Sequence, residues 1–298
     1  MADVIVAEGF TKFYGATRGV EDLSFEVHPG EVFGYLGPNG AGKTTTIRTM
    51  LDLIRPTDGD IRLFGMRPRE DAPAIHARVG YLPGELALYE RMTGLEFLEA
   101  FGSFRGGVPR SRIGSFAERL SLDLTKRIRS LSHGNKQKVG LVLAFVHEPE
   151  LLILDEPTQG LDPLMQQEFY AMVDEARARG ATVFLSSHVM PEVERVCDRV
   201  AIIREGRLAT VADIGDLKAR AVRHLELHFD GPAPLDAFAS LPSVRDAQAH
   251  GDTLRLTVHG VVDPVVKEAA RHTVVSVASE EPSLEEIFLE IYRDGRRP

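Results

Sequence analysis

The segment EVFGYLG (31–37), followed by PNGAGKTTTIRTML, constrains the fold more than any other part of this sequence. Its short apolar run predicts a buried strand, and the glycine-rich turn after it leads into a predicted helix. The spacing G-x-x-x-x-G-K-[ST] of a Walker A loop is met by Gly37, Gly42, Lys43 and Thr44. Such a loop surrounds phosphate oxygens with backbone N–H groups, a lysine charge and a hydroxyl that can ligate Mg²⁺. A chance glycine turn is the alternative, but strand, loop and helix in this order favour a nucleotide site in an α/β fold.

Two further apolar runs end in polar side chains. The run LLILDEP (151–157) ends with Asp155 and Glu156, and TVFLSSH (182–188) ends with His188. In a parallel α/β sheet ligands bind beyond the carboxyl ends of the strands, so these side chains are expected at one edge. One acid can hold Mg²⁺, the other can polarise the water that attacks the γ-phosphate, and the histidine can donate to that phosphate. An acidic pair alone could also be a helix cap or a surface pair.

The segment LSHGNKQKV (131–139) predicts the start of a helix with Ser132 as its N-cap residue. The free N–H groups of a helix N-terminus bind anions. Because the chain already has a phosphate-binding loop, a second anion site is most useful in trans, facing a nucleotide that another copy holds. A capped surface helix is the alternative.

The order of these motifs resembles the nucleotide-binding subunit of an ABC transporter. The matching segments are GPNGAGKTT (37–45), LSHGN (131–135), LLILDE (151–156), TQGLD (158–162) and SSH (186–188). The resemblance covers residues 1 to about 212, and its most specific part is the serine-glycine signature. It implies a P-loop NTPase core of the ABC ATPase class with a helical subdomain at about 85–150. It also implies ATP and Mg²⁺ as cofactors and a homodimer in which Ser132 and Gly134 face the partner's γ-phosphate.

The resemblance also assigns roles to individual residues. Lys43, Glu156 and His188 are the expected catalytic residues, and Thr44, Asp155 and Glu85 are the expected Mg²⁺ ligands. Nucleotide binding is expected from Tyr14, Gly37, Pro38, Asn39, Gly40, Ala41, Gly42, Lys43, Thr44, Thr45, Ser132 and Gly134. Tyr14 would stack on adenine, although Phe10 or Phe13 could take that place.

This sequence departs from the family pattern at three positions. Gly84 stands where the family has a glutamine that ligates Mg²⁺, and Glu85 is the candidate replacement, although its carboxylate adds negative charge beside the phosphates. His133 and Asn135 replace a glycine and a glutamine of the signature. The signature variants resemble those of the drug- and antibiotic-export (ABC-2-type) branch, whose ATPase subunits are separate polypeptides.

Composition agrees with a soluble protein of two domains. The 298 residues are 43% apolar and 27% charged, and the net charge of -9 argues against nucleic acid as a partner. The single Cys197 suits a reducing compartment. The start MADVIVAEGF has no secretory pattern, and no apolar run reaches the roughly 18 residues of a membrane span. The resemblance therefore implies a cytoplasmic subunit, peripheral on the inner face of the cell membrane and held there by a transmembrane permease subunit.

The remaining part of the chain predicts a second, smaller domain. Residues 1–220 form the expected nucleotide-binding domain, and 221–298 show short strands and helices in the order βαββαβ, typical of a ferredoxin-like α+β domain. A helix follows, with Ser283 and Glu286 in a capping box. This domain lacks a phosphate loop or metal motif, so packing or dimerisation is its expected role.

Together these features predict an ATPase subunit that powers a membrane exporter of a drug, antibiotic or lipid-like substrate through ATP-driven dimerisation. The segment from Gly84 to Thr93 is expected to push on the permease. Three alternatives are an importer ATPase subunit, a soluble ABC ATPase outside transport, and a regulator that binds ATP without hydrolysing it.

Overall fold

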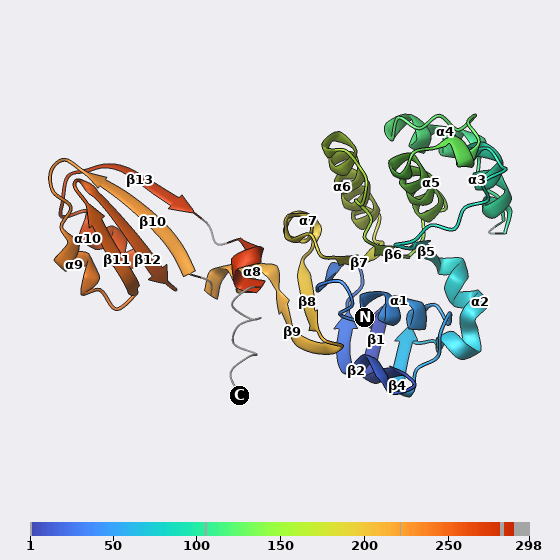
Figure 1. Cartoon of the computed structure of the whole chain (residues 1–298), viewed down its shortest axis with the longest axis horizontal. Helices are drawn as coiled ribbons and strands as arrows, with labels where there is room; N and C mark the ends of the chain where they lie inside the picture. Colours follow the sequence, from blue (N-terminus) through green and yellow to red (C-terminus); the bar gives the residue numbers. More distant parts are fainter. Residues whose placement is uncertain (1, 105, 221, 281–282, 289–298) are drawn as a thin grey trace. The chain divides into compact units, whose positions relative to one another are not determined.

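The computed structural model describes residues 2–104, 106–220, 222–280 and 283–288. The chain folds into two compact units that divide between Val211 and Ala212, and each is described by itself (Figure 1). The helix α8 (Ile214–Arg220) belongs to the second unit, whereas the sequence prediction kept it with the first.

A six-stranded sheet with the order β5-β6-β7-β3-β8-β9 is the centre of the first unit. Its strands are β3 (Val32–Leu36), β5 (Val79–Leu82), β6 (Leu151–Asp155), β7 (Thr182–Ser187), β8 (Arg199–Arg204) and β9 (Arg207–Asp213). From β5 to β8 neighbouring strands are parallel. Strands β3, β6 and β7 are buried along their whole length, as the apolar runs predicted. Because parallel strands end at one edge, the segments that follow β3, β5, β6 and β7 meet there.

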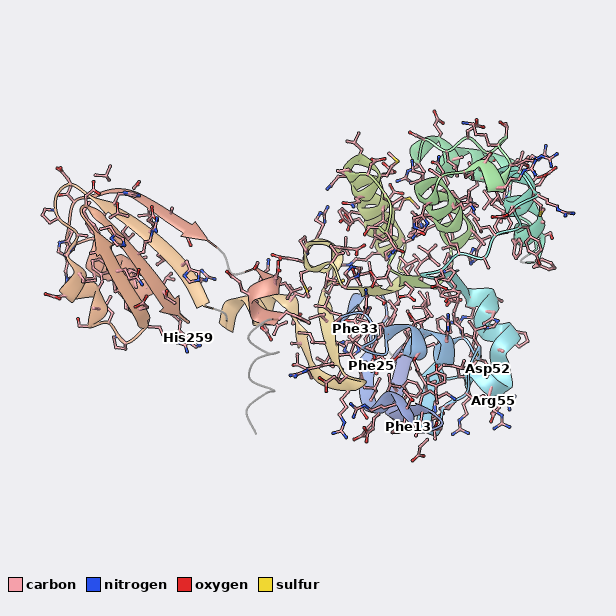
Figure 2. All side chains as sticks on the ribbon, viewed as in Figure 1. Phe13, Phe25, Phe33, Asp52, Arg55 and His259 are labelled. Atoms are coloured by element: carbon pink, nitrogen blue, oxygen red, sulfur yellow. The ribbon has the colours of Figure 1, made fainter. Side chains whose placement is uncertain are left out.

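A second sheet supports the first from one side. It is antiparallel, with the order β2-β1-β4, and consists of β1 (Ile5–Tyr14), β2 (Thr17–Val27) and β4 (Asp58–Leu63). Phe25 on β2 stacks on Phe33 of β3 with 5.9 Å between ring centroids, and Phe33 stacks on Phe184 of β7 at 6.0 Å. Figure 2 labels Phe25 and Phe33. These buried rings hold β3, and therefore the loop after it, against a second layer of structure.

Helices complete the first unit. The helix α1 (Lys43–Met50) follows the loop after β3 and packs against β2, β4 and β6. Three helices pack on one another within residues 85–150, namely α3 (Gly94–Ser103), α4 (Arg110–Arg119) and α5 (His133–Phe145), and α5 also packs on β5. The other elements are α2 (Pro68–Arg78), the 3-10 turn η1 (Ile128–Ser130), α6 (Pro163–Ala178) and α7 (Met190–Val196).

The second unit contains a four-stranded antiparallel sheet with the order β11-β12-β10-β13. Its elements follow α8 in the order β10 (Val222–Phe229), α9 (Leu235–Ala239), β11 (Val244–His250), β12 (Thr253–His259), α10 (Asp263–Ala269) and β13 (Val274–Glu280). The order βαββαβ confirms the predicted ferredoxin-like fold.

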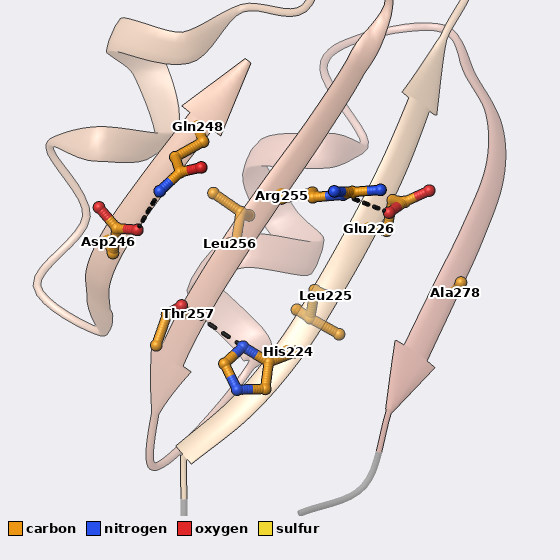
Figure 3. A pocket seen from close by; sticks show the side chains of 9 residues that line it. All are labelled: His224, Leu225, Glu226, Asp246, Gln248, Arg255, Leu256, Thr257 and Ala278. Carbon is orange, nitrogen blue, oxygen red and sulfur yellow. Dashed lines mark hydrogen bonds and ion pairs between the residues drawn. The ribbon is translucent and has the colours of Figure 1, made fainter. Parts of the chain in front are cut away.

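The two faces of this sheet differ in polarity. Leu225, Leu227 and Phe229 of β10 pack into an apolar core with side chains of α9 and α10. Polar side chains such as Glu226 and Arg255 alternate with them and line a hollow of about 490 Å³ on the opposite face (Figure 3). Glu226 and Arg255 form an ion pair at 2.7 Å on this face, and Asp246 accepts from Gln248 at 3.0 Å.

The capping box predicted after the last strand is present. The hydroxyl of Ser283 accepts from the N–H of Glu286 at 3.3 Å, and the carboxylate of Glu286 accepts from the N–H of Ser283 at 3.2 Å. These two bonds confirm the predicted helix start. The part of the predicted helix from residue 289 onward lies outside the described residues.

Candidate functional site

The loop between β3 and α1 borders a hollow of about 370 Å³ at the carboxyl edge of the sheet. The predicted loop residues that line it are Pro38, Asn39, Gly40, Gly42, Lys43, Thr44 and Thr45, whereas Gly37 and Ala41 do not. Gly42 has φ 109°, and a Cβ atom there would collide with Val20. Only glycine therefore lets the loop run this close to β2. No side chain caps the N-terminus of α1, so its first N–H groups remain available to bind an anion.

Lys43 is held at this site by three contacts, one of which is from Nζ to the carbonyl of Pro38 at 3.4 Å. Its Nζ donates to the carbonyl of Gly37 at 2.7 Å and lies 3.3 Å from Oε1 of Glu156. Only 6% of the side chain is exposed. A buried ammonium group held at the loop can place positive charge beside the phosphates.

Asp155 and Thr44 lie side by side, as their predicted role as Mg²⁺ ligands requires. Oδ2 of Asp155 accepts from the Thr44 hydroxyl at 3.0 Å, and Oδ1 accepts from Ser186 at 2.8 Å. Burial raises the pKa of Asp155, and the bonds from Ser186 and Thr44 partly oppose that effect. Hard oxygen donors of this kind fit Mg²⁺. The described ranges contain no cluster of three or more acidic, histidine or cysteine side chains suited to a metal, so phosphate oxygens and water would complete the shell.

Glu156 lies between the two other predicted catalytic residues. Its Oε2 is 2.7 Å from Nδ1 of His188, and its Oε1 faces Lys43. The backbone of Glu156 has φ 51°, in the left-handed region that residues other than glycine rarely adopt. The structure therefore brings Lys43, Glu156 and His188 together at the end of β6, as the motif order predicted.

Gly84 and Glu85 follow β5 and line the same hollow. A Cβ atom at Gly84 would lie 3.2 Å from Oδ2 of Asp155, so a longer side chain there would reach the predicted metal ligands. Glu85 is exposed at the rim of the hollow. Its role as a ligand stays a prediction.

The aromatic residues near the start of the chain differ in exposure. Tyr14 is 47% exposed, and its hydroxyl lies 3.4 Å from the hydroxyl of Thr45, so its ring is available beside the loop although it does not line the hollow. Phe10 is fully buried in the core, which excludes it as a stacking residue for adenine. Phe13 is half-buried.

The signature residues lie apart from the hollow of their own chain. Ser132 is the N-cap residue of α5, and its hydroxyl accepts from the N–H of Asn135 at 3.3 Å. Ser132 is exposed, and neither it nor Gly134 lines the hollow. Gly134 packs so closely on Gly160 that a Cβ atom would collide with the Gly160 carbonyl. This glycine therefore has a packing role whatever it binds.

Sequence reasoning missed several residues that line the hollow, among them Arg48, Tyr81 and Gln159. Arg48 lies one helical turn after Thr44, a spacing that could have indicated it. Burial, with Asp155 adding to it, raises the pKa of Tyr81 to about 12. Gln159 lies in the TQGLD segment (158–162), which resembles the family pattern but did not indicate a role for this side chain.

Comparison with known proteins identifies the family. A family model described as ABC transporter matches residues 20–159. The bacitracin transport ATP-binding protein BcrA of Enterococcus faecalis is 34% identical over 302 residues, which cover 99% of this chain and 98% of that protein. The chain belongs to the ABC transporter family. The linearmycin resistance ATP-binding protein LnrL of Bacillus subtilis is 33% identical to this ABC protein, over 97% of the chain and 98% of the relative.

Solved structures agree with the assignment of this chain to the ABC transporter family. One described as the ATP-binding subunit of an ABC transporter is 32% identical, with a TM-score of 0.67 over 72% of this chain and 92% of the other. A cassette bound to ADP and Pi, 20% identical, shares the fold with a TM-score of 0.66 over 70% of this chain and 98% of the other. The ABC protein is thus an ATP-binding subunit with ATPase activity, which confirms the family and activity predicted from the motifs.

Proposed function

We propose that this ATPase powers a membrane exporter of a drug, antibiotic or lipid-like substrate. The observation that carries the proposal is the similarity to bacitracin transport and linearmycin resistance proteins, which extends over 97% to 99% of the chain. It therefore includes the second unit as well as the nucleotide site. A similarity limited to the first unit would fit any ABC ATPase equally well.

The hydrolysis step follows from the contacts at the carboxyl edge. Glu156 would act as general base toward the attacking water, and His188 would orient Glu156 and donate to the γ-phosphate. Lys43 would neutralise charge on the β- and γ-phosphates, while Tyr14 stacks on adenine. Thr44 and Asp155, with Glu85 as a further candidate, would hold Mg²⁺, which when bound stabilises charge on the phosphate oxygens.

Two copies would act together as a homodimer. Ser132 and Gly134 of one copy would face the phosphate that the loop of the other copy holds. The exposure of Ser132, outside the hollow of its own chain, supports this arrangement.

The permease would contact the segment from Gly84 to Thr93. Tyr89 is 63% exposed, and its ring lies 6.4 Å from that of Phe97 and 5.8 Å from that of Phe101. Tyr89 thus exposes an aromatic side chain that packs on rings of α3, and an exposed aromatic residue suits contact with a membrane subunit. The described ranges hold no helix with the length and hydropathy of a membrane span. We place the subunit on the inner face of the cell membrane through this contact.

A genetic experiment tests export. Deleting the gene in its native host should raise sensitivity to at least one antibiotic in a panel of membrane-active and peptide compounds. The wild-type gene should restore resistance, whereas a Glu156→Gln gene should not, because glutamine keeps size and hydrogen bonding but cannot accept the proton. Unchanged sensitivity together with loss of uptake of a solute would contradict export and favour an importer.

A further inference from the structure

Gln137 connects α5, called the signature helix because it begins after Ser132, to Glu156, the proposed general base. It lies on α5 and is 1% exposed. Its Nε2 donates to two backbone carbonyls, that of Glu156 at 3.3 Å and that of Pro157 at 3.1 Å. A buried amide donor that loses its partners costs free energy, so the side chain is confined to these carbonyls.

The backbone of Glu156 needs such support because its left-handed conformation is unfavourable for a residue with a side chain. Its N–H donates to the carbonyl of Ser186 at 2.9 Å. Its carbonyl accepts from the N–H of Gln159 at 3.2 Å and from Gln137. Ser186 and Gln159 belong to the neighbouring strand and to the turn that follows Glu156. Gln137 is the contact that reaches this backbone from the helices of residues 85–150.

We propose that Gln137 is a positioning residue for ATP hydrolysis: it holds the backbone of Glu156 so that the carboxylate faces Lys43 and His188. The proposal rests on the proposed role of Glu156 as general base. Gln137 does not line the hollow beside the nucleotide-binding loop, and it acts through the main-chain carbonyls of Glu156 and Pro157.

This contact also couples the position of the signature helix to the position of Glu156 in the same chain. The helix α5 begins directly after Ser132, which would face the nucleotide of the partner copy. A displacement of α5 when two copies close would therefore move the carbonyl of Glu156 through one side chain. Closure at one composite site would thus adjust the base that serves the other site.

The substitution Gln137→Met in the full-length chain tests the proposal, because methionine has similar length but no donor. We expect kcat to fall about tenfold or more, since a small displacement of a reacting group can cost up to roughly 10²-fold. KM for ATP should stay unchanged. In a Glu156→Gln background the same substitution should cause no further loss, because the base that it positions is already absent.

Two further variants serve as controls. Gln137→Asn keeps the amide but is one methylene shorter. If the bonds to the two carbonyls matter, this variant should lose activity as Gln137→Met does. It replaces Gln137→Met in the test if that variant fails to fold. Gln166 on α6 makes a similar bond, from its Nε2 to the carbonyl of Leu161 at 3.3 Å. The substitution Gln166→Met removes that bond and should leave kcat at the wild-type value.

Three outcomes overturn the proposal: wild-type kcat in a folded Gln137 variant, a rise in KM that accounts for the whole loss, or losses that multiply with Glu156→Gln. Thermal unfolding of every variant shows whether it is folded. Wild-type hydrolysis by Glu156→Gln alone would instead remove the general-base assignment, so the two failures are distinguishable.

Discussion

Glu192 is a buried acid that contacts the turn before His188. Only 1% of it is exposed, and its Oε2 accepts from the Ser187 hydroxyl at 2.6 Å. Burial raises its pKa to about 7, while bonds from Ser187 and Thr158 oppose that rise. The same Ser187 hydroxyl accepts from the N–H of Val189, so this carboxyl helps to fix the turn that presents His188.

Stability should depend on the ionisation of this carboxyl. Because the folded pKa of Glu192 lies above its ordinary value of 4.5, its contribution is fully present below pH 4.5 and is lost as pH rises through about 7. We expect the free energy of unfolding of wild type, relative to Glu192→Gln, to fall by about 3 kcal/mol over that window. Denaturant unfolding from pH 4.5 to 8 measures it. If the free energies of unfolding of the two proteins changed with pH in parallel, the result would contradict the raised pKa of Glu192. Asp155, whose pKa is also raised, is present in both proteins, so its contribution to the pH dependence cancels in the comparison.

Motif spacing indicated the residues that are proposed to meet phosphate or Mg²⁺, because that chemistry allows few residue types at few distances along the chain. Lys43, Asp155 and His188 belong to this class. Gln137 and Glu192 do not, because the partners of Gln137 are main-chain carbonyls 19 and 20 residues away and a partner of Glu192 is the hydroxyl of Ser187, 5 residues away. An amide or acid with such partners leaves no pattern in the sequence, and only the folded chain shows it.

Among the elements, the buried parallel strands were the easiest to predict, and the N-cap at Ser132 gave the start of α5 correctly. Continuous apolar runs such as 151–155 have one stable location, in the middle of a parallel sheet. The boundary of the two units was harder, because α8 has no sequence feature that ties it to either unit. Its assignment depends on tertiary contacts.

The signature helix supplies a test that belongs to this scale. A Lys43→Ala subunit mixed with a Ser132→Arg subunit should recover part of the ATPase activity that each lacks alone. In the mixed dimer one composite site pairs an intact loop with an intact helix start, whereas each homodimer has no such site. The measurement is ATPase rate against mixing ratio, with mixed dimers verified by two affinity tags. Background activity at every ratio, once turnover by a single intact site has been established, would contradict action in trans.

At the scale of the whole molecule, all residues that line the hollow beside the nucleotide-binding loop lie in the first unit. The second unit adds its own apolar core and its own sheet. A chain that ends after β9, at Asp213, should therefore bind ATP with an affinity within about threefold of the full chain, a difference below 1 kcal/mol. Fluorescent-nucleotide titration measures it, and thermal unfolding verifies that the shortened chain is folded. A large loss of affinity would mean that the second unit supports the nucleotide site.

The central place of β3 has a consequence for synthesis on the ribosome. This strand leaves the ribosome early, yet its neighbours in the sheet are β7 and β8, which follow much later. Pairing between segments so far apart in the chain is slow, and until it occurs the apolar strand has no partner in its sheet. Because the proposed site residues extend to His188, ATP can stabilise the nascent protein only after β7 has emerged, and the apolar strands synthesised before it lack that stabilisation until then.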